Sequence, residues 1–387
     1  MDRVRIGLVG TGFAADLHAV NYRALRGQKV ELTAVCGRRR ESAEHFAGRF
    51  GLPRVFTDYR ALAESPEVDC VDICVPTAIH HEVAMAAAGA GKHLIVEKPL
   101  TGYFGEGDEP RERMLEGALK NADSVLDAVK QAGVTLCYAE DFVYAPPVAK
   151  LKRLMAASGG AVLELRAEES HSGSHASYSG RWKTSGGGSF LRMGSHPVGV
   201  VLHLKHYEGQ LREGRPIRAR SVLTDVGQLT RLPHVAAEPR KWMRADWADV
   251  EDWSTAVITF EDGTKATIHA NDITLGGIRN QVTAYLANAV VQVSINPNTT
   301  IQTYTPDPVV WKDEYLTEKV ETRAGWQFPS PDEDWIRGFP QELEDFVDAI
   351  RQGREPMSGA ALAREVVEVI YAGYLSAASG RRVDLRR

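Results

Sequence analysis

The 387-residue chain is long enough for two domains, and its 43% hydrophobic and 25% charged residues are typical of a globular protein. A net charge of −5 provides no basic field for nucleic acid, and no run reaches the roughly 18 apolar residues that a membrane span needs. The amino terminus lacks a signal-peptide pattern and the four cysteines lie in apolar strand-like runs, so we expect buried free thiols in a cytoplasmic protein.

The chain begins with an apolar strand over residues 4–9, then a glycine-containing turn, then a predicted helix over 16–25. The turn has the pattern G-x-G-x-x-A, which between a strand and a helix is the dinucleotide-binding fingerprint. Its first glycine permits a tight turn, its second lets a pyrophosphate approach the backbone, and the helix amino terminus attracts phosphate. The residues predicted to bind the cofactor here are Gly10, Thr11, Gly12, Phe13 and Ala14.

The second strand, residues 31–36, ends without the acidic residue that would bind the ribose 2′-hydroxyl of NAD. It ends on Gly37, Arg38, Arg39 and Arg40. Two interpretations stay open: the arginines bind the 2′-phosphate of NADP, or they only begin the next helix. We place Gly37 and Arg38 at the cofactor site and expect NAD, with NADP as the alternative.

Strands and helices continue to alternate, with strands at 68–75 and 92–96, which predicts a parallel, doubly wound sheet. The first of these strands leads into Pro76, Thr77 and His80, and the second ends on Glu97-Lys98-Pro99. Ligands of open α/β sheets bind at the carboxyl ends of the strands. A surface ion pair is the alternative interpretation of Glu97 and Lys98.

The glycine turn, Pro76-Thr77 with His80, and Glu97-Lys98-Pro99 together resemble the motifs of the Gfo/Idh/MocA oxidoreductase family. The resemblance covers the first third of the chain. It implies that Lys98 lies beside the nicotinamide and helps to deprotonate a sugar hydroxyl, with Glu97 next to it. Pro76, Thr77, His80, Glu97 and Lys98 are accordingly assigned to the cofactor site. The segment 102–113 is longer than is usual in the family. Two interpretations of this segment stay open: a lid over the active site, or a disordered insertion.

The second half favours a different architecture. Alternating polarity predicts strands at 161–167, 217–223, 255–260, 264–270, 281–287 and 290–295, and helical periodicity follows at 342–351 and 361–378. Hairpin turns make this sheet largely antiparallel. We therefore expect an α/β protein: a Rossmann dinucleotide-binding domain over 1–140, and an α+β domain with a large, mostly antiparallel open sheet over 141–387.

The segment 168–204 is rich in polar residues and glycine, and His196 stands at the start of an apolar helix. In the family a similar region carries an Asp four residues before the histidine and often another three after it. Here Arg192 and Gly199 occupy those positions. The resemblance implies a catalytic His196, and Arg192 favours an anionic substrate.

The same segment supplies further candidates for the substrate site, namely His171, Arg181, Trp182, Lys183, Arg192 and His196. A solvated basic loop is the alternative for Arg181 and Lys183. His171 and His175 lack a helical setting and a carboxylate at ligand spacing, so no metal site is predicted.

Two reactions are compatible with these residues. The departures at Arg192 and Gly199 favour a redox-neutral glycoside hydrolase that resembles the NAD-dependent, sulfoquinovosidase-like branch of the family. It would oxidise carbon 3 of an anionic pyranoside, eliminate the aglycone, add water and return the hydride. The alternative is a simple NAD(P)-dependent sugar or polyol dehydrogenase. The family resemblance also implies a homo-dimer or homo-tetramer.

Overall fold

The computed structural model describes residues 2–25, 29–296 and 299–385, and in it the chain forms two compact units. The chain passes between the units several times, because residues 105–115 belong to unit 2 and residues 338–367 belong to unit 1. One of these passages, at 141–142, lies close to the predicted boundary of 140–141. Unit 1 comprises residues 1–104, 116–141 and 338–367. Unit 2 comprises residues 105–115, 142–337 and 368–387.

Unit 1 is built on a six-stranded sheet in the order β3-β2-β1-β4-β5-β6, with every neighbouring pair parallel. The predicted Rossmann-type sheet is therefore confirmed. The order reverses at β1 and β4, the point at which such sheets bind their ligands. The strands are β1 (Val4–Val9), β2 (Val30–Cys36), β3 (Arg54–Phe56), β4 (Cys70–Ile73), β5 (His93–Glu97) and β6 (Leu136–Ala139).

The helices of unit 1 bury small and aromatic residues at helical spacing, as Ala15, Ala19 and Tyr22 do on α1. The last long helix but one, α12, packs against α1 and β1, so a late segment of the chain completes the first unit. The helices are α1 (Phe13–Ala24), α2 (Arg40–Phe50), α3 (Tyr59–Ala63), α4 (His80–Gly89), α5 (Arg111–Ala132), α12 (Phe339–Gln352) and α13 (Ala360–Ser379), of which α5 and α13 extend into unit 2. The short turns of 3₁₀ helix are η1 (Thr77–Ile79) and η2 (Asp141–Val143).

Unit 2 contains a seven-stranded sheet in the order β12-β11-β7-β10-β9-β8-β15. Only β7 and β10 pair in parallel, and the other neighbours are antiparallel, which confirms the predicted mostly antiparallel sheet. The strands are β7 (Val162–Ser170), β8 (Ala219–Gly227), β9 (Trp253–Phe260), β10 (Lys265–Asn271), β11 (Arg279–Leu286), β12 (Val290–Asn296) and β15 (Val383–Asp384).

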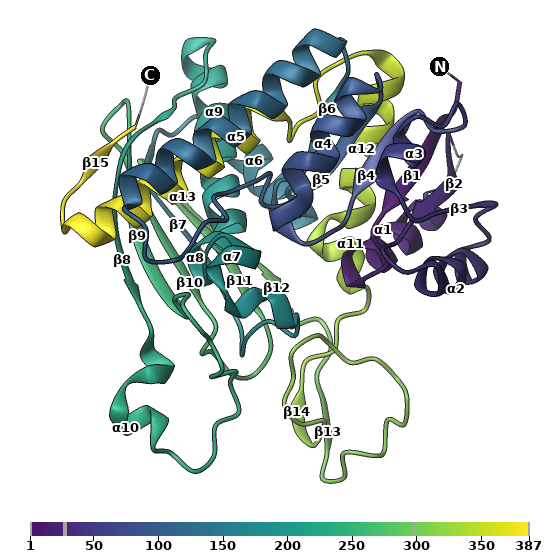
Figure 1. Ribbon diagram of the computed structural model, residues 1–387. Helices are drawn as coiled ribbons and strands as arrows, with labels where there is room; N and C mark the ends of the chain where they lie inside the picture. Colours follow the sequence, from purple (N-terminus) through teal and green to yellow (C-terminus); the bar gives the residue numbers. More distant parts are fainter. Residues whose placement is uncertain (1, 26–28, 297–298, 386–387) are drawn as a thin grey trace. The chain divides into compact units, whose positions relative to one another are not determined.

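Helix α9 lies against β7 and β10, and α6 lies against β12 (Figure 1). Every residue of α9 from Ser195 to Lys205 is buried, as expected for a helix enclosed within a core. The helices of unit 2 are α6 (Pro146–Ser158), α7 (Trp182–Ser185), α8 (Ser189–Arg192), α9 (Ser195–Glu213), α10 (Pro233–Ala236) and α11 (Glu333–Arg337). The short turns η3 (Ser177–Gly180) and η4 (Leu229–Arg231) complete it.

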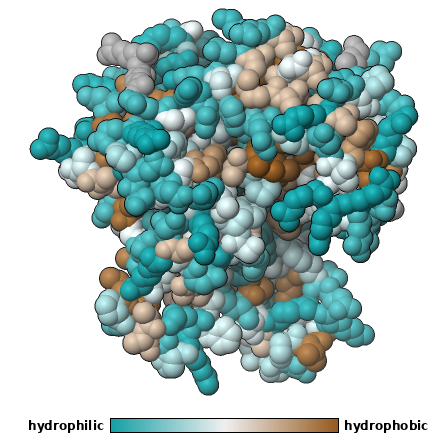
Figure 2. All heavy atoms as spheres, viewed as in Figure 1, coloured by the Kyte–Doolittle hydropathy of each residue, from teal (hydrophilic) through white to brown (hydrophobic). Residues whose placement is uncertain are grey.

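A two-stranded hairpin of β13 (Thr303–Thr305) and β14 (Gly325–Gln327) projects from unit 2 (Figure 1). Its Tyr304 and Trp326 rings are 5.5 Å apart and both are largely exposed. In Figure 2 brown hydrophobic spheres lie among hydrophilic ones where this hairpin is drawn.

All four cysteines, each within the described ranges, are buried free thiols, as expected. Among the helices of the described residues, none combines the length and the apolarity that crossing a bilayer requires.

Candidate active site

The predicted cofactor residues of unit 1 follow the carboxyl ends of β1, β2, β4 and β5, which lie at one edge because these strands are parallel. Gly10 has φ of 128°, and a Cβ atom added to it would lie 2.1 Å from the carbonyl oxygen of Cys74. Around Gly12, in contrast, no atom lies within 4 Å of an added Cβ. No side chain caps the amino terminus of α1 at Gly12. A tight turn, an open approach and uncapped N–H groups fit the pyrophosphate of a dinucleotide.

The residues after β2 border this turn. A Cβ atom at Gly37 would come within 2.9 Å of the Thr11 methyl group, so a glycine lets the two turns pack together. Arg38 is exposed immediately after Gly37. Phe13 directly follows Gly12 and is 70% exposed, so the described side chains of unit 1 leave most of its ring uncovered.

His80 is the first residue of α4, after the loop and the 3₁₀ turn that follow β4, and it is buried. Its Nε2 faces the carbonyl oxygen of Val75 at 2.8 Å, and its Nδ1 faces that of Pro99 at 3.0 Å. Burial lowers the pKa of His80. The ring therefore connects the segment that leads into Pro76 and the buried Thr77 to the Lys98–Pro99 peptide.

Glu97 and Lys98 end β5 at the same edge of the sheet. One Glu97 oxygen accepts a hydrogen bond from the Lys98 backbone N–H at 2.9 Å. The other lies 3.3 Å from Nε2 of His18, a fully buried residue of α1. His18 Nδ1 in turn lies 2.9 Å from a carboxylate oxygen of the buried Asp72. Contact with His18 keeps the pKa of Glu97 below its ordinary value although burial opposes this.

In unit 2, His196 is the second residue of α9 and is 4% exposed. Its ring stacks on Phe142 with the centroids 4.8 Å apart. Its Nε2 lies 3.7 Å from a carboxylate oxygen of Glu169, near the carboxyl end of β7. Sequence reasoning missed Glu169, because the parallel pairing of β7 with β10 that places it at a strand end appears only in the structure.

Arg192, at the end of α8, forms an ion pair with Asp272, the residue that follows β10. The guanidinium also lies over Trp247, 4.8 Å from the ring centroid. Asp272 is fully buried, and burial raises its pKa although Arg192 counteracts this. The charge reversal expected at Arg192 is thus compensated by a carboxylate that the sequence analysis did not identify.

The remaining substrate candidates occupy different environments. His171 is buried just after β7, and its Nδ1 accepts a hydrogen bond from the Gly173 N–H at 2.9 Å. Arg181 and Lys183 are exposed. Lys183 is 2.7 Å from Glu106 of the segment 102–113, both side chains being 67% exposed. The structure therefore brings Arg192, His196 and His171 near the strand ends and leaves Arg181 and Lys183 at the surface of unit 2.

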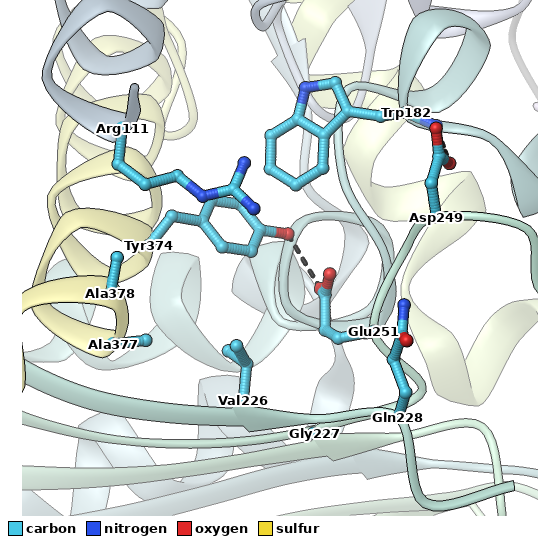
Figure 3. A pocket seen from close by; sticks show the side chains of 10 residues that line it. All are labelled: Arg111, Trp182, Val226, Gly227, Gln228, Asp249, Glu251, Tyr374, Ala377 and Ala378. Carbon is cyan, nitrogen blue, oxygen red and sulfur yellow. Dashed lines mark hydrogen bonds between the residues drawn. The ribbon is translucent and has the colours of Figure 1, made fainter. Parts of the chain in front are cut away.

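Trp182 is buried and supports the glycine-rich turn of residues 186–188. Its backbone N–H donates to Asp249 at 2.7 Å, and Arg111 lies 4.5 Å above its ring. Figure 3 shows these side chains around a cavity of about 260 Å³. The lining residues are Arg111, Trp182, Val226, Gly227, Gln228, Asp249, Glu251, Tyr374, Ala377 and Ala378.

One further residue of unit 2 was missed from the sequence. Lys319 has φ of 63°, a conformation uncommon for residues other than glycine, and its Nζ donates to the carbonyl of Gly173 at 2.9 Å. Burial is the main cause of the lowered pKa of Lys319, which also responds to Asp272 and Arg192. No motif in the sequence marked it.

Two family models match the chain. Residues 4–116 match "Oxidoreductase family, NAD-binding Rossmann fold" of the GFO_IDH_MocA model. Residues 148–291 match "GFO/IDH/MocA C-terminal domain". The first lies mostly in unit 1 and the second within unit 2.

Individual proteins are also similar. Levoglucosan dehydrogenase of Pseudarthrobacter phenanthrenivorans is 31% identical over 159 residues, which is 40% of this chain and only 37% of that protein. D-xylose 1-dehydrogenase (NADP(+)) 2 of Haloferax volcanii is 23% identical over 98% of both chains. The crystal structure of GenD2 from gentamicin A biosynthesis in complex with NAD has a TM-score of 0.81 at 25% identity, covering 100% of this chain and 97% of that one.

Proposed function

The chain belongs to the Gfo/Idh/MocA oxidoreductase family, and from that membership we propose that it oxidises a secondary hydroxyl of a neutral sugar or polyol. Unit 1 is an NAD-binding Rossmann domain. The observation that carries the proposal is the Glu97-Lys98 pair, held by His18 and His80 at the edge of the sheet where the glycine turn lies. When bound, the nicotinamide dinucleotide accepts the hydride from the substrate carbon.

The proposal gives two residues a part in proton transfer. Lys98 of unit 1 receives the proton of the reacting hydroxyl, and the Glu97 carboxylate beside it balances the charge that results. His196 of unit 2 is stacked on Phe142 and close to Glu169, so its ring has a fixed plane from which to bind and exchange a hydroxyl proton. Glu169, His171 and Lys319 supply the further donors and acceptors that a polyhydroxylated ring requires.

The charges of unit 2 support a neutral substrate. Arg192 is paired with Asp272, and Lys183 is paired with Glu106, so neither is an uncompensated cation. A sulfonate or carboxylate would have to compete with a fully buried carboxylate for Arg192. Two relatives described above are named for levoglucosan and D-xylose, which are neutral sugars.

A redox-neutral glycoside hydrolase is the second candidate. It is favoured by Arg192 and Gly199, which stand where the sequence pattern of a simple dehydrogenase has acidic residues. Such an enzyme would begin with the same hydride transfer at carbon 3, eliminate the aglycone across carbons 1 and 2, add water and return the hydride. The two candidates therefore share the first step and differ in whether reduced cofactor accumulates.

One assay separates the candidates. Purified protein is incubated with a set of neutral and sulfonated aryl glycosides and free sugars, first with excess NAD and then with excess NADP. Reduced cofactor and released aglycone are followed together. Accumulation of reduced cofactor without aglycone is expected for the dehydrogenase, whereas aglycone release without net reduction would establish the hydrolase. Neither signal with any neutral sugar, but activity with sulfonated glycosides, would contradict the neutral substrate.

A further inference from the structure

His18 of α1 lies between two carboxylates that come from different strands. Its Nδ1 is 2.9 Å from Asp72 Oδ2 on β4, and its Nε2 is 3.3 Å from Glu97 Oε1 on β5. His18 and Asp72 are fully buried, and the Glu97 side chain is 15% exposed. A neutral imidazole carries one N–H and would present a lone pair to one of these carboxylates, whereas an imidazolium hydrogen-bonds Asp72 through Nδ1 and forms an ion pair with Glu97 through Nε2.

The groups around the pair of carboxylates favour a charged ring. Asp72 also accepts hydrogen bonds from the Tyr22 hydroxyl at 2.9 Å and from the Cys74 thiol at 3.4 Å, so its buried oxygens have donors besides the imidazole. Burial opposes the charge on the imidazole, but the attraction of Asp72 and the contacts with Cys74 outweigh it. The pKa of His18 is consequently raised well above its ordinary value.

Three other ionisable groups act on this site from neighbouring segments of unit 1. Lys98 lowers and Asp141 raises the pKa of Glu97. Glu342 of α12 also faces the site, and burial holds its pKa well above the usual range. The titratable groups that determine the local charge are therefore Asp72, His18, Glu97, Lys98, Asp141 and Glu342.

We propose that His18 is a positioning residue for the reaction at Lys98: as an imidazolium bound to Asp72 and Glu97, it keeps the Glu97 carboxylate ionised and fixed beside Lys98. Asp72 on β4 thus stabilises the charge on His18, and His18 in turn stabilises the charge on Glu97 at the end of β5. The inference rests on the role of Lys98 in the proposed function.

The kinetic test compares His18→Gln and Asp72→Asn with the wild-type enzyme. Glutamine keeps an amide donor but has no charge, and Asp72→Asn removes the anion that stabilises the imidazolium. Both should lower kcat by about tenfold or more, leave the dissociation constant of the cofactor within about threefold, and move the acidic limb of the pH–kcat profile to higher pH. Tyr22→Phe is the control, since it removes one uncharged hydrogen bond from Asp72 and should leave the limb in place.

An acidic limb of His18→Gln that coincides with the wild-type limb would overturn the inference, and so would an equal displacement by Tyr22→Phe. Failure of the proposed function gives a different result. In that case Lys98→Met would remain active, whatever the pH–kcat profile of His18→Gln.

A measurement on the wild-type protein covers the case in which the variants do not fold. In ¹⁵N-labelled protein the ring of His18, identified by its contact with Tyr22, should have both nitrogens protonated at about pH 8, above the ordinary histidine pKa. A neutral tautomer at that pH would refute the imidazolium and with it the proposal.

Discussion

Arg192 is bound to Asp272, a fully buried carboxylate at the end of β10. The guanidinium is held at the same time over the face of Trp247. The side chain that suggested an anionic substrate therefore has a structural partner within unit 2, and its main electrostatic effect is to compensate a buried charge. Breaking such a pair on one side only is costly, because it leaves the other charge buried and unpaired.

Arg192→Met should lower the free energy of unfolding by about 3 kcal/mol, and the double variant Arg192→Met/Asp272→Asn should regain most of it. Without Arg192 the folded-state pKa of Asp272 rises further above its unfolded value of 3.8. Stability is then lost as pH rises through that range, so the deficit should be larger at about pH 8 than at about pH 4.5. Urea unfolding at both pH values measures this. A single variant as stable as wild type would contradict the structural importance of the pair.

Lys98→Met should lower kcat by about 10²- to 10⁴-fold, the range of general acid–base contributions, because the acceptor for the hydroxyl proton is lost. The cofactor dissociation constant should change little, since the glycine turn is untouched. Steady-state kinetics and a fluorescence titration with NADH separate the two quantities.

Lys92→Met is the matched control for Lys98. This lysine precedes the other end of β5 and donates to the carbonyls of Ser65 and Val68. It should leave kcat almost unchanged. If both variants lose turnover equally, or if Lys98→Met loses the cofactor, the role assigned to Lys98 is wrong.

The glycine-rich turn before His196 is fixed by close contacts that exclude a side chain. A Cβ atom at Gly188 would lie 2.0 Å from the carbonyl oxygen of Glu251. The carboxylate of Glu251 accepts hydrogen bonds from the N–H groups of Gly188 and Phe190 and from the Tyr374 hydroxyl, so it cannot move away freely. Gly188→Ala should therefore destabilise the protein by about 1–3 kcal/mol.

Denaturant unfolding tests this cost against Gly48→Ala, a change in helix α2 where no atom lies within 4 Å of an added Cβ. The control should gain about 0.5–1 kcal/mol, since alanine is the better helix former. Equal effects of the two substitutions would show that the turn at Gly188 relaxes easily.

The sequence predicted those parts of the site that follow from local pattern. The residues of the glycine turn are consecutive in the chain, and so are Glu97 and Lys98. Each group lies at the end of a strand of the parallel sheet, so strand periodicity and a short motif are enough to locate it. His18, Asp72, Glu169 and Asp272 were missed because their significance depends on partners that are 27 to 80 residues away in the chain. Asp72 gave the clearest signal that went unused, as a carboxylate within an apolar strand.

The domain arrangement illustrates a second limit. Helical periodicity predicted helices near the positions of α12 and α13, but periodicity identifies a buried face without its partner. The return of α12 to unit 1, where it packs on α1 and β1, depends on contacts between segments that are far apart in the chain. The paired charge of Arg192 is of the same kind, since Asp272 is 80 residues further along the chain.

Glu342 of α12 provides a test of that tertiary arrangement through pH. The side chain is fully buried, and neither carboxyl oxygen has a hydrogen-bond partner among the described residues. Burial, and then the nearby Asp141 and Glu97, hold its pKa well above the ordinary 4.5. Because the folded-state value exceeds the unfolded one, the contribution of Glu342 to stability is complete below about pH 4.5 and is lost as pH rises.

Glu342→Gln does not titrate, so the stability of this variant relative to wild type should increase by up to about 1.4 kcal/mol for each pH unit above the unfolded value. Urea unfolding from about pH 5 to about pH 8 measures the difference. Glu344→Gln, the same change at an exposed position of α12, controls for the altered helix charge and should give no such slope. Parallel stability curves for wild type and Glu342→Gln would mean that this carboxyl group reaches solvent, which would contradict the packing of α12 against α1.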